Sequence, residues 1–176
     1  MKNWSKESLT EIATVSTGKR DANHATEEGY YRFYTCAENY LYCDTKRFEG
    51  ECLILPGNGV NVGEVFYFDG EFDAYQRTYV INDIKIYPKY LHYHMLLYWK
   101  QLGTKKQYGS ATNFIKIGNF KDYEVQYPPQ KEQKRIVSIL DRAFAAIDKA
   151  KANAEKNLEN AAVLFESYLQ DVFENQ

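Results

Sequence analysis

His92 and His94 stand one residue apart, and Cys36, Cys43 and Cys52 precede them in the chain. Imidazole and thiolate groups are common zinc ligands, so a metal centre is the first chemistry to consider. On a helix, however, residues two positions apart point about 200° away from each other, and the cysteines lack the C-x-x-C spacing of zinc or redox pairs. We therefore predict no metal site. An odd number of cysteines without a leader segment predicts reduced thiols and a cytoplasmic location.

The stretch GNGVNVG, residues 57–63, has three glycines in seven residues, which indicates a loop of unusual backbone geometry. It lacks the G-K-[ST] ending of a phosphate-binding loop and the spacing of a dinucleotide fingerprint. The sequence shows no nucleophile elbow of the G-x-S-x-G kind and no nuclease carboxylate motif. It therefore predicts a protein without catalytic residues or a cofactor of its own.

The chain carries 22 Lys and Arg residues against 24 Asp and Glu, a formal net charge of −2. A protein that coats nucleic acid through bulk charge is clearly basic, so any nucleic-acid binding here must depend on a local basic surface. No apolar run of about 18 residues occurs, and no membrane span is expected.

Turn and cap signals divide the first 130 residues into short elements. The sequence SLTE at 8–11 is a capping box that opens a short helix, and Asp69-Gly70 is the signal for a tight type I′ hairpin. Pro88 suits the first turn of a helix that ends at Gly103 and carries Leu91, Met95, Tyr98 and Leu102 on its apolar side. Aromatic and β-branched runs predict strands at 30–35, 52–56, 64–68, 74–81, 113–117 and 123–127.

After Pro128 and Pro129, residues 131–173 contain neither glycine nor proline. Apolar side chains recur there with spacings of three and four, the pattern of a coiled coil with one stutter. Such a helix is about 65 Å long, whereas a globular body of this size is only about 35–40 Å across. We expect the helix to project and to need a partner along its stripe; a bent helix lying on its own domain is the alternative. We place Lys131, Glu132, Gln133, Lys134 and Arg135 in its solvated first turns.

The junction YPPQKEQKRIVSILD, residues 127–141, closely resembles the P-P-x-x-E-Q-x-x-I motif of the DNA specificity subunits of type I restriction-modification systems. The beginning of the chain is also similar to that family, with W-x-x-x-x-L-x-E-I-A at 4–13 and TGKRDAN at 17–23. So are FDAYQRTYVI at 72–81 and GSATNFIKI at 109–117. Because these pieces occur in order, the resemblance covers the chain from end to end.

The resemblance implies an α+β fold: a target recognition domain with a mixed sheet over residues 1–128, followed by a long coiled-coil-forming spacer helix over 129–176. A full specificity subunit carries this unit twice, with the two helices antiparallel, and each recognition domain reads half of a bipartite DNA site. It is non-catalytic and docks methyltransferase subunits, which use S-adenosylmethionine, and through them the restriction subunit. The junction region is a plausible docking surface for the methyltransferase subunit.

This chain holds one such unit, so it is either a natural half-size subunit or a fragment. In both cases a homodimer is the simplest way to bury the stripe, and it would read an interrupted palindrome. The predicted interface consists of Ile136, Leu140, Ala143, Ile147, Ala150, Ala154, Leu158, Ala161, Phe165, Tyr168 and Val172.

Arg and Lys favour guanine edges and phosphates, and Asn and Gln favour adenine. The candidates for DNA contact are Lys19, Arg20 and Asn23 in the first polar loop, Asn58 and Asn61 in the glycine loop, Gln76, Arg77 and Thr78 on a predicted strand, and Lys105, Lys106, Ser110, Thr112 and Asn113 in the loop after the helix. Arg77 could equally form a structural ion pair. An interaction or scaffold module whose coiled coil is its whole function remains the alternative reading.

Overall fold

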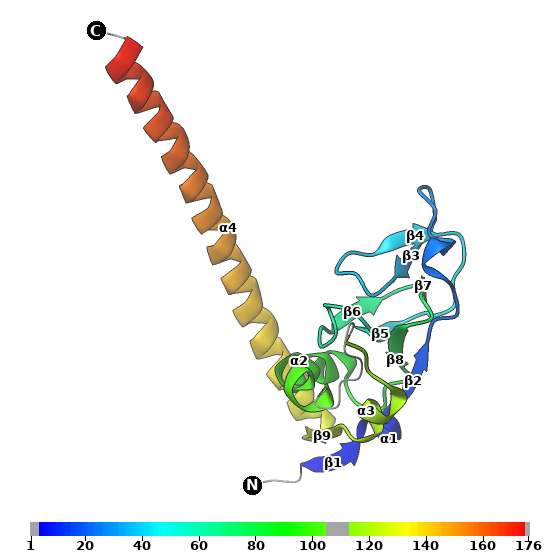
Figure 1. The fold of residues 1–176 in the computed structure, drawn as a ribbon. Helices are drawn as coiled ribbons and strands as arrows, with labels where there is room; N and C mark the ends of the chain where they lie inside the picture. The colour runs from blue at the N-terminus through cyan, green and yellow to red at the C-terminus, as the bar shows by residue number, and fades with distance from the viewer. Residues whose placement is uncertain (1–3, 105–112, 175–176) are drawn as a thin grey trace. The chain divides into compact units, whose positions relative to one another are not determined.

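The computed structural model describes residues 4–104 and 113–174, and the chain divides into two compact units, Met1–Lys134 and Arg135–Gln176. The fold is α+β with a long C-terminal helix, as the sequence predicts (Figure 1). In chain order the elements are β1 (Ser5–Ser8), α1 (Leu9–Ile12), β2 (Thr14–Thr17), a 3-10 turn (Ala22–His24), β3 (Tyr31–Tyr34), β4 (Leu41–Cys43), β5 (Glu51–Pro56), β6 (Phe66–Asp69), β7 (Phe72–Ala74), β8 (Thr78–Asn82), α2 (Pro88–Tyr98), a π-helical turn (Trp99–Gly103), α3 (Ile117–Lys121), β9 (Glu124–Tyr127) and α4 (Gln130–Glu174).

The strands of the first unit form three small sheets. The largest has the order β2-β8-β5-β6 and is antiparallel throughout. The second has the order β4-β3-β7, with β3 antiparallel to β4 and parallel to β7. In the third, β1 pairs with β9, so the beginning of the unit is hydrogen-bonded to its last strand.

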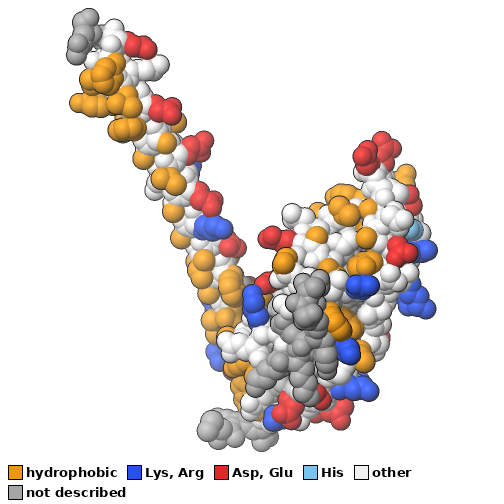
Figure 2. Space-filling view, in the orientation of Figure 1, with side chains coloured by type: hydrophobic (Ala, Val, Ile, Leu, Met, Phe, Trp, Pro, Cys, Tyr) orange, Lys and Arg blue, Asp and Glu red, His pale blue; other side chains and the backbone are white. Residues whose placement is uncertain are grey.

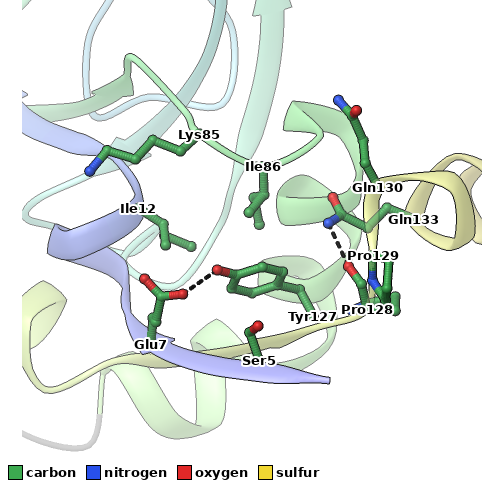
Figure 3. A pocket seen from close by; sticks show the side chains of 10 residues that line it. All are labelled: Ser5, Glu7, Ile12, Lys85, Ile86, Tyr127, Pro128, Pro129, Gln130 and Gln133. Atoms are coloured by element: carbon green, nitrogen blue, oxygen red, sulfur yellow. Dashed lines mark hydrogen bonds between the residues drawn. The ribbon is translucent and has the colours of Figure 1, made fainter. Parts of the chain in front are cut away.

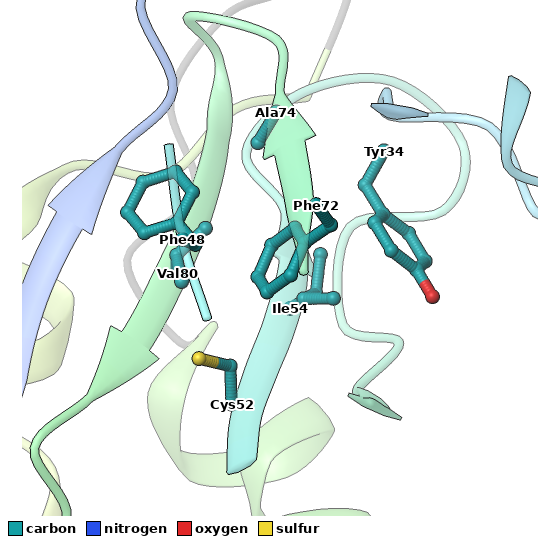
Figure 4. Close-up of a cluster of buried hydrophobic side chains, with 7 residues drawn as sticks. All are labelled: Tyr34, Phe48, Cys52, Ile54, Phe72, Ala74 and Val80. Atoms are coloured by element: carbon teal, nitrogen blue, oxygen red, sulfur yellow. The ribbon is translucent and has the colours of Figure 1, made fainter. Parts of the chain in front are cut away.

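A cluster of buried aromatic and aliphatic side chains joins the two larger sheets (Figure 4). Phe72 of β7 lies at its centre: its ring stacks on Phe48 at 5.3 Å between centroids and meets Tyr34 and Phe68 edge-on at 5.4 and 5.7 Å. Offset and edge-to-face pairs of this kind add to the free energy gained by burying apolar area. The cluster is why one short strand suffices to hold the second sheet against the first.

The predicted hairpin at Asp69-Gly70 is wrong. β6 ends at Asp69 in the first sheet, whereas β7 begins at Phe72 in the second, so the chain crosses between sheets there instead of turning back. The amide of Gly70 donates to the Gly50 carbonyl, and Phe72 exchanges both backbone hydrogen bonds with Phe48. Burial of Phe72 in the core outweighs the local preference of Asp69-Gly70 for a tight turn.

Two further strand predictions are only partly right. Residues 113–117 form an isolated bridge, from Phe114 to Asn58, and Ile117 then opens α3. The Asn119 side chain caps that helix by accepting the Lys116 amide at 3.0 Å, which ends any extended pairing. Within 74–81, Ala74 ends β7 and β8 begins only at Thr78, because residues 76–77 form a turn.

The helix after Pro88 buries Leu91 and Met95, as predicted, but not Tyr98 and Leu102, which are exposed. Trp99 is buried in their place, stacked on Phe120 with ring centroids 4.7 Å apart. A Cβ on Gly103 would lie 1.9 Å from the Trp99 ring. The π-helical turn therefore changes which side of the helix is buried, and it requires glycine at its end.

Gln133, expected in a solvated turn, is only 2% exposed. Its side-chain amide donates to the Pro128 carbonyl at 2.7 Å, and its side-chain oxygen accepts the Tyr87 amide at 2.8 Å. Pro129 helps to begin α4, since its carbonyl accepts the amides of Glu132 and Gln133. One side chain thus connects the first turn of α4 to the segment before α2, within the first unit.

α4 is continuous over 45 residues, about 67 Å at 1.5 Å per residue. Every described residue from Arg142 onward is exposed, including Ile147, Leu158, Phe165 and Tyr168 of the predicted stripe. Hydrophobic side chains accordingly run along the helix in Figure 2. Pairing through this stripe stays a prediction.

His92 and His94 serve separate contacts inside the first unit. His92 Nε2 lies 3.3 Å from the Val65 carbonyl, and His94 Nδ1 lies 3.0 Å from the Tyr123 hydroxyl. Burial lowers the pKa of His92 and lowers the pKa of His94 to about 4.

Substituting Gln133 by Ala should lower the free energy of unfolding by about 1–3 kcal/mol, because the buried Tyr87 amide and Pro128 carbonyl would lose their partner. Urea unfolding of the full chain measures this. Gln130→Ala, an exposed residue in the same turn, should change the midpoint little. Equal effects of the two substitutions would contradict the role given to Gln133.

Stability should fall as the pH is lowered from about 6.5 to 4. The unfolded chain protonates His94 near the ordinary pKa of about 6.5, whereas the folded chain does so only near 4, so the unfolded state binds more protons across this window. Urea midpoints at pH 7.5 and 5 measure the difference. His94→Asn should make it smaller, and an unchanged pH dependence in that variant would count against His94 as a source.

Candidate nucleic-acid interface

A buried carboxylate organises the loop that carries Lys19, Arg20 and Asn23. Asp73 of β7 is 1% exposed, and its two oxygens accept the Ala74 amide and the Thr45 hydroxyl, each at 2.8 Å. Arg20 Nε lies 3.6 Å from the same carboxylate. Since the Thr45 hydroxyl gives its proton to Asp73, it accepts from His24 Nε2 at 2.8 Å. Arg20 directly, and His24 through Thr45, thus attach the loop to Asp73 of β7.

The same loop lies directly beside the turn at 75–77. Arg20 forms a parallel bridge with Tyr75, and its carbonyl accepts the Gln76 amide at 2.9 Å. The Gln76 side chain then donates to Asp21 at 2.7 Å. Lys19, Arg20, Asn23, Gln76 and Arg77, which are far apart in the sequence, are therefore brought together with exposed side chains.

The glycine loop and the segment from Asn113 adjoin this turn. The Gly57 amide donates to the Arg77 carbonyl at 2.9 Å, and the Gly59 amide donates to the Asn113 carbonyl at 2.8 Å. A Cβ on Gly57 would lie 2.2 Å from the Arg77 carbonyl oxygen, and Gly59 has φ +87°. Gly57 is thus required by the close approach of the Arg77 carbonyl, and Gly59 by its left-handed backbone conformation. Neither glycine needs a bound phosphate to explain it.

The predicted contacts divide into four groups. The first lies in the four adjoining segments and consists of Lys19, Arg20, Asn23, Gln76, Arg77, Asn58 and Asn113, which we call the recognition cluster. The side-chain amide of Asn61 donates to the Cys36 carbonyl at 2.9 Å. Thr78 is fully buried, so its side chain is not available to DNA, contrary to the prediction. The calls on Lys105, Lys106, Ser110 and Thr112 lie outside the described residues.

Sequence reasoning missed Asp73, Thr45 and His24. The available signal was a charged residue in the otherwise apolar run FDA at 72–74, because a carboxylate is rarely fully buried unless it is paired. The network needs residues from three separate stretches, and no local pattern connects them.

A cavity of about 350 Å³ lies elsewhere in the first unit, around the two prolines (Figure 3). Its lining is mixed and includes the apolar Ile86, Glu7, which accepts from the Tyr127 hydroxyl, and Lys85, which donates to the Glu11 carbonyl at 2.7 Å. The charged groups here serve the protein itself, so the cavity offers no evident catalytic arrangement.

The part of the chain that the structure describes has three free thiols that lie in no cluster of possible metal ligands. It contains no group of three or more His, Cys, Asp or Glu side chains placed to hold an ion, and none of its helices has the length and hydropathy of a membrane span. Cys36, Cys43 and Cys52 are free thiols, and burial raises the pKa of Cys52 to about 11.

Comparison with known proteins gives consistent results. Residues 1–160 match the family model of the type I restriction modification DNA specificity domain. The chain is 35% identical over 153 residues to the specificity subunit of the type I restriction enzyme EcoDI of Escherichia coli, covering 87% of this chain and 34% of that protein. It is 30% identical over 159 residues to a putative type I specificity subunit of Mycoplasma pneumoniae, covering 82% of this chain and 46% of that protein.

The fold is similar to solved specificity subunits. The type I restriction-modification S subunit from M. genitalium aligns with a TM-score of 0.67 at 18% identity, over 99% of this chain and 46% of that one. The HsdS subunit from Thermoanaerobacter tengcongensis aligns with a TM-score of 0.62 at 18% identity, over 97% of this chain and 44% of that one. The chain spans less than half the length of these relatives, and it belongs to the type I restriction-modification DNA specificity family.

Proposed function

We propose that this chain is a DNA-recognition unit of a type I restriction-modification complex, with the recognition cluster as the surface that reads the site. The observation that carries the proposal is the convergence of Lys19, Arg20, Gln76 and Arg77 on a framework held by the buried Asp73. Guanidinium and ammonium groups suit guanine edges and phosphates, and amides suit adenine. Because the framework already fixes the backbone that carries these side chains, less conformational entropy of the loops is lost when they bind.

The unit has no catalysis of its own in this proposal. It directs a methyltransferase subunit, which supplies S-adenosylmethionine, and a restriction subunit to the site in the cytoplasm. The family membership supports this role, and no catalytic group is needed in the recognition cluster to explain it.

We further propose that two copies pair through α4. The stripe from Ile136 to Val172 repeats at coiled-coil spacing and is exposed from Ala143 onward, and an exposed apolar band of this length favours a partner. A symmetric pair would carry two recognition clusters, so its site would be bipartite and palindromic. The competing candidate is a scaffold module that pairs through α4 without reading DNA.

Arg77→Ala should weaken binding to a duplex selected from a randomised pool by about 5- to 150-fold, because a base contact from arginine is worth about 1–3 kcal/mol. The exposed side chain is removed while the Arg77 carbonyl still accepts the Gly57 amide. Lys6→Ala is the matched control, since Lys6 is an exposed cation that already pairs with Glu124 at 2.5 Å. If the intact chain binds no duplex at low salt and still pairs, the scaffold reading is correct.

Ile147→Asp should convert a dimer to a monomer in sedimentation velocity, because it would bury a charge in the stripe. Ala145→Asp introduces the same charge two residues earlier, about 200° around the helix, and should leave the dimer intact. A monomeric wild-type chain would contradict the pairing model.

A further inference from the structure

Arg32 lies in a stack of aromatic rings on the second sheet. Alternation along β3 puts Arg32 and Tyr34 on one face and Phe33 on the other. The guanidinium carbon lies 4.2 Å from the centroid of the Tyr40 ring and 4.4 Å from that of Phe68. Contacts of a cation with aromatic faces at such distances are attractive. The guanidinium group of Arg32 is therefore held in one orientation by the two rings.

The charge of Arg32 has no counter-charge among the described residues. Its one hydrogen bond goes from Nη1 to the Tyr34 hydroxyl at 3.3 Å, and this bond raises the pKa of Arg32. A guanidinium group has five N–H donors, so most of them remain for another acceptor. Lys46, in the same region, differs from Arg32, since it pairs with Glu71 and Glu49.

Exposed tyrosines border the stack. Tyr40 and Tyr42 are 36% and 44% exposed, with ring centroids 5.6 Å apart in an edge-to-face arrangement. A hydrogen bond with the Tyr40 side chain raises the pKa of Tyr42, and both hydroxyls are protonated at neutral pH. The stack therefore presents N–H and O–H donors together with aromatic surface.

The stack is continuous with the recognition cluster. The Tyr75 amide donates to the Tyr34 carbonyl at 2.8 Å, and Cys36 Sγ donates to the Arg77 carbonyl at 3.3 Å. The strand that carries Arg32 thus ends against the turn that carries Arg77. β3 therefore connects that turn to the position of Arg32 within the second sheet.

We propose that Arg32, Tyr40 and Tyr42 form a second DNA contact, which binds a backbone phosphate next to the bases that the recognition cluster reads. The inference rests on the proposed function, and it assigns this surface to affinity and orientation, since phosphate contacts carry no sequence information. Exposed tyrosine and arginine also suit protein partners. The unneutralised cation and its continuity with the recognition cluster favour a polyanion over a protein.

The test uses the full chain and the selected duplex, with wild type compared to Arg32→Met and Tyr42→Phe. Methionine keeps apolar packing between the rings but removes the charge, so the affinity should fall about equally on selected and unrelated duplexes. The slope of log affinity against log salt should become shallower by about one. Tyr42→Phe removes one exposed hydroxyl and should weaken binding a few-fold at an unchanged slope. Lys46→Met is the control for long-range charge and should change affinity less than twofold.

Single methylphosphonate substitutions along the duplex locate the contact. Neutralising one particular phosphate should lower the affinity of wild type but leave the affinity of Arg32→Met unchanged. Neutralising any other phosphate should change the affinity of both proteins equally. Urea midpoints near that of wild type confirm that the variants are folded. If Arg32→Met does not fold, Tyr42→Phe alone tests the contact. The inference alone is overturned if Arg77→Ala weakens binding while Arg32→Met and Tyr42→Phe do not, or if they impair only binding to a protein partner. An intact chain that binds no duplex overturns the proposed function as well.

Discussion

The first unit of the fold depends on one buried carboxylate. An ionised group of this kind is costly to bury unless its oxygens are hydrogen-bonded, and Asp73 meets that condition with a backbone amide, a threonine hydroxyl and a nearby arginine. Those partners come from β7, from the segment after β4 and from the first polar loop. Satisfying the carboxylate therefore forces three distant stretches of the chain together.

β7 has a second role that explains why such a short strand holds its place. Its three residues are all buried: Phe72 centres the aromatic cluster, Asp73 anchors the polar loop, and Ala74 lies against the backbone of Gly18. Alternation along the strand directs Phe72 to the core between the sheets and Asp73 toward the loop. Apolar burial and polar satisfaction thus act on the same strand, and neither can be changed alone.

Much of the architecture was predictable because its signals are local. The capping box at Ser8, where the Ser8 amide donates to Glu11 at 2.9 Å, is a pattern of adjacent residues. So are the proline before α2, the apolar run of β5 and the unbroken stripe of α4. Each is set by preferences that span a few turns or fewer.

The failures share a different cause. Gly70, Thr78 and Gln133 have ordinary local signals for a hairpin, an exposed polar strand residue and a solvated helix turn. Their true roles depend on partners that are distant in the sequence, such as Phe48 for the crossing at Gly70 and Tyr87 for Gln133. When distant segments bury a side chain, the adjacent residues in the sequence carry no signal of that burial.

The framework of the recognition cluster uses main-chain atoms at three of its most exposed positions. The carbonyl groups of Arg20, Arg77 and Asn113 accept the amides that join the loops, and the Arg77 and Asn113 side chains make no contact that the framework requires. A carbonyl is the same in every residue type, so new side chains at positions 77 and 113 would change the chemistry of the surface while leaving its scaffold in place. Such a surface can change its binding chemistry by point substitution, without first passing through a destabilised intermediate.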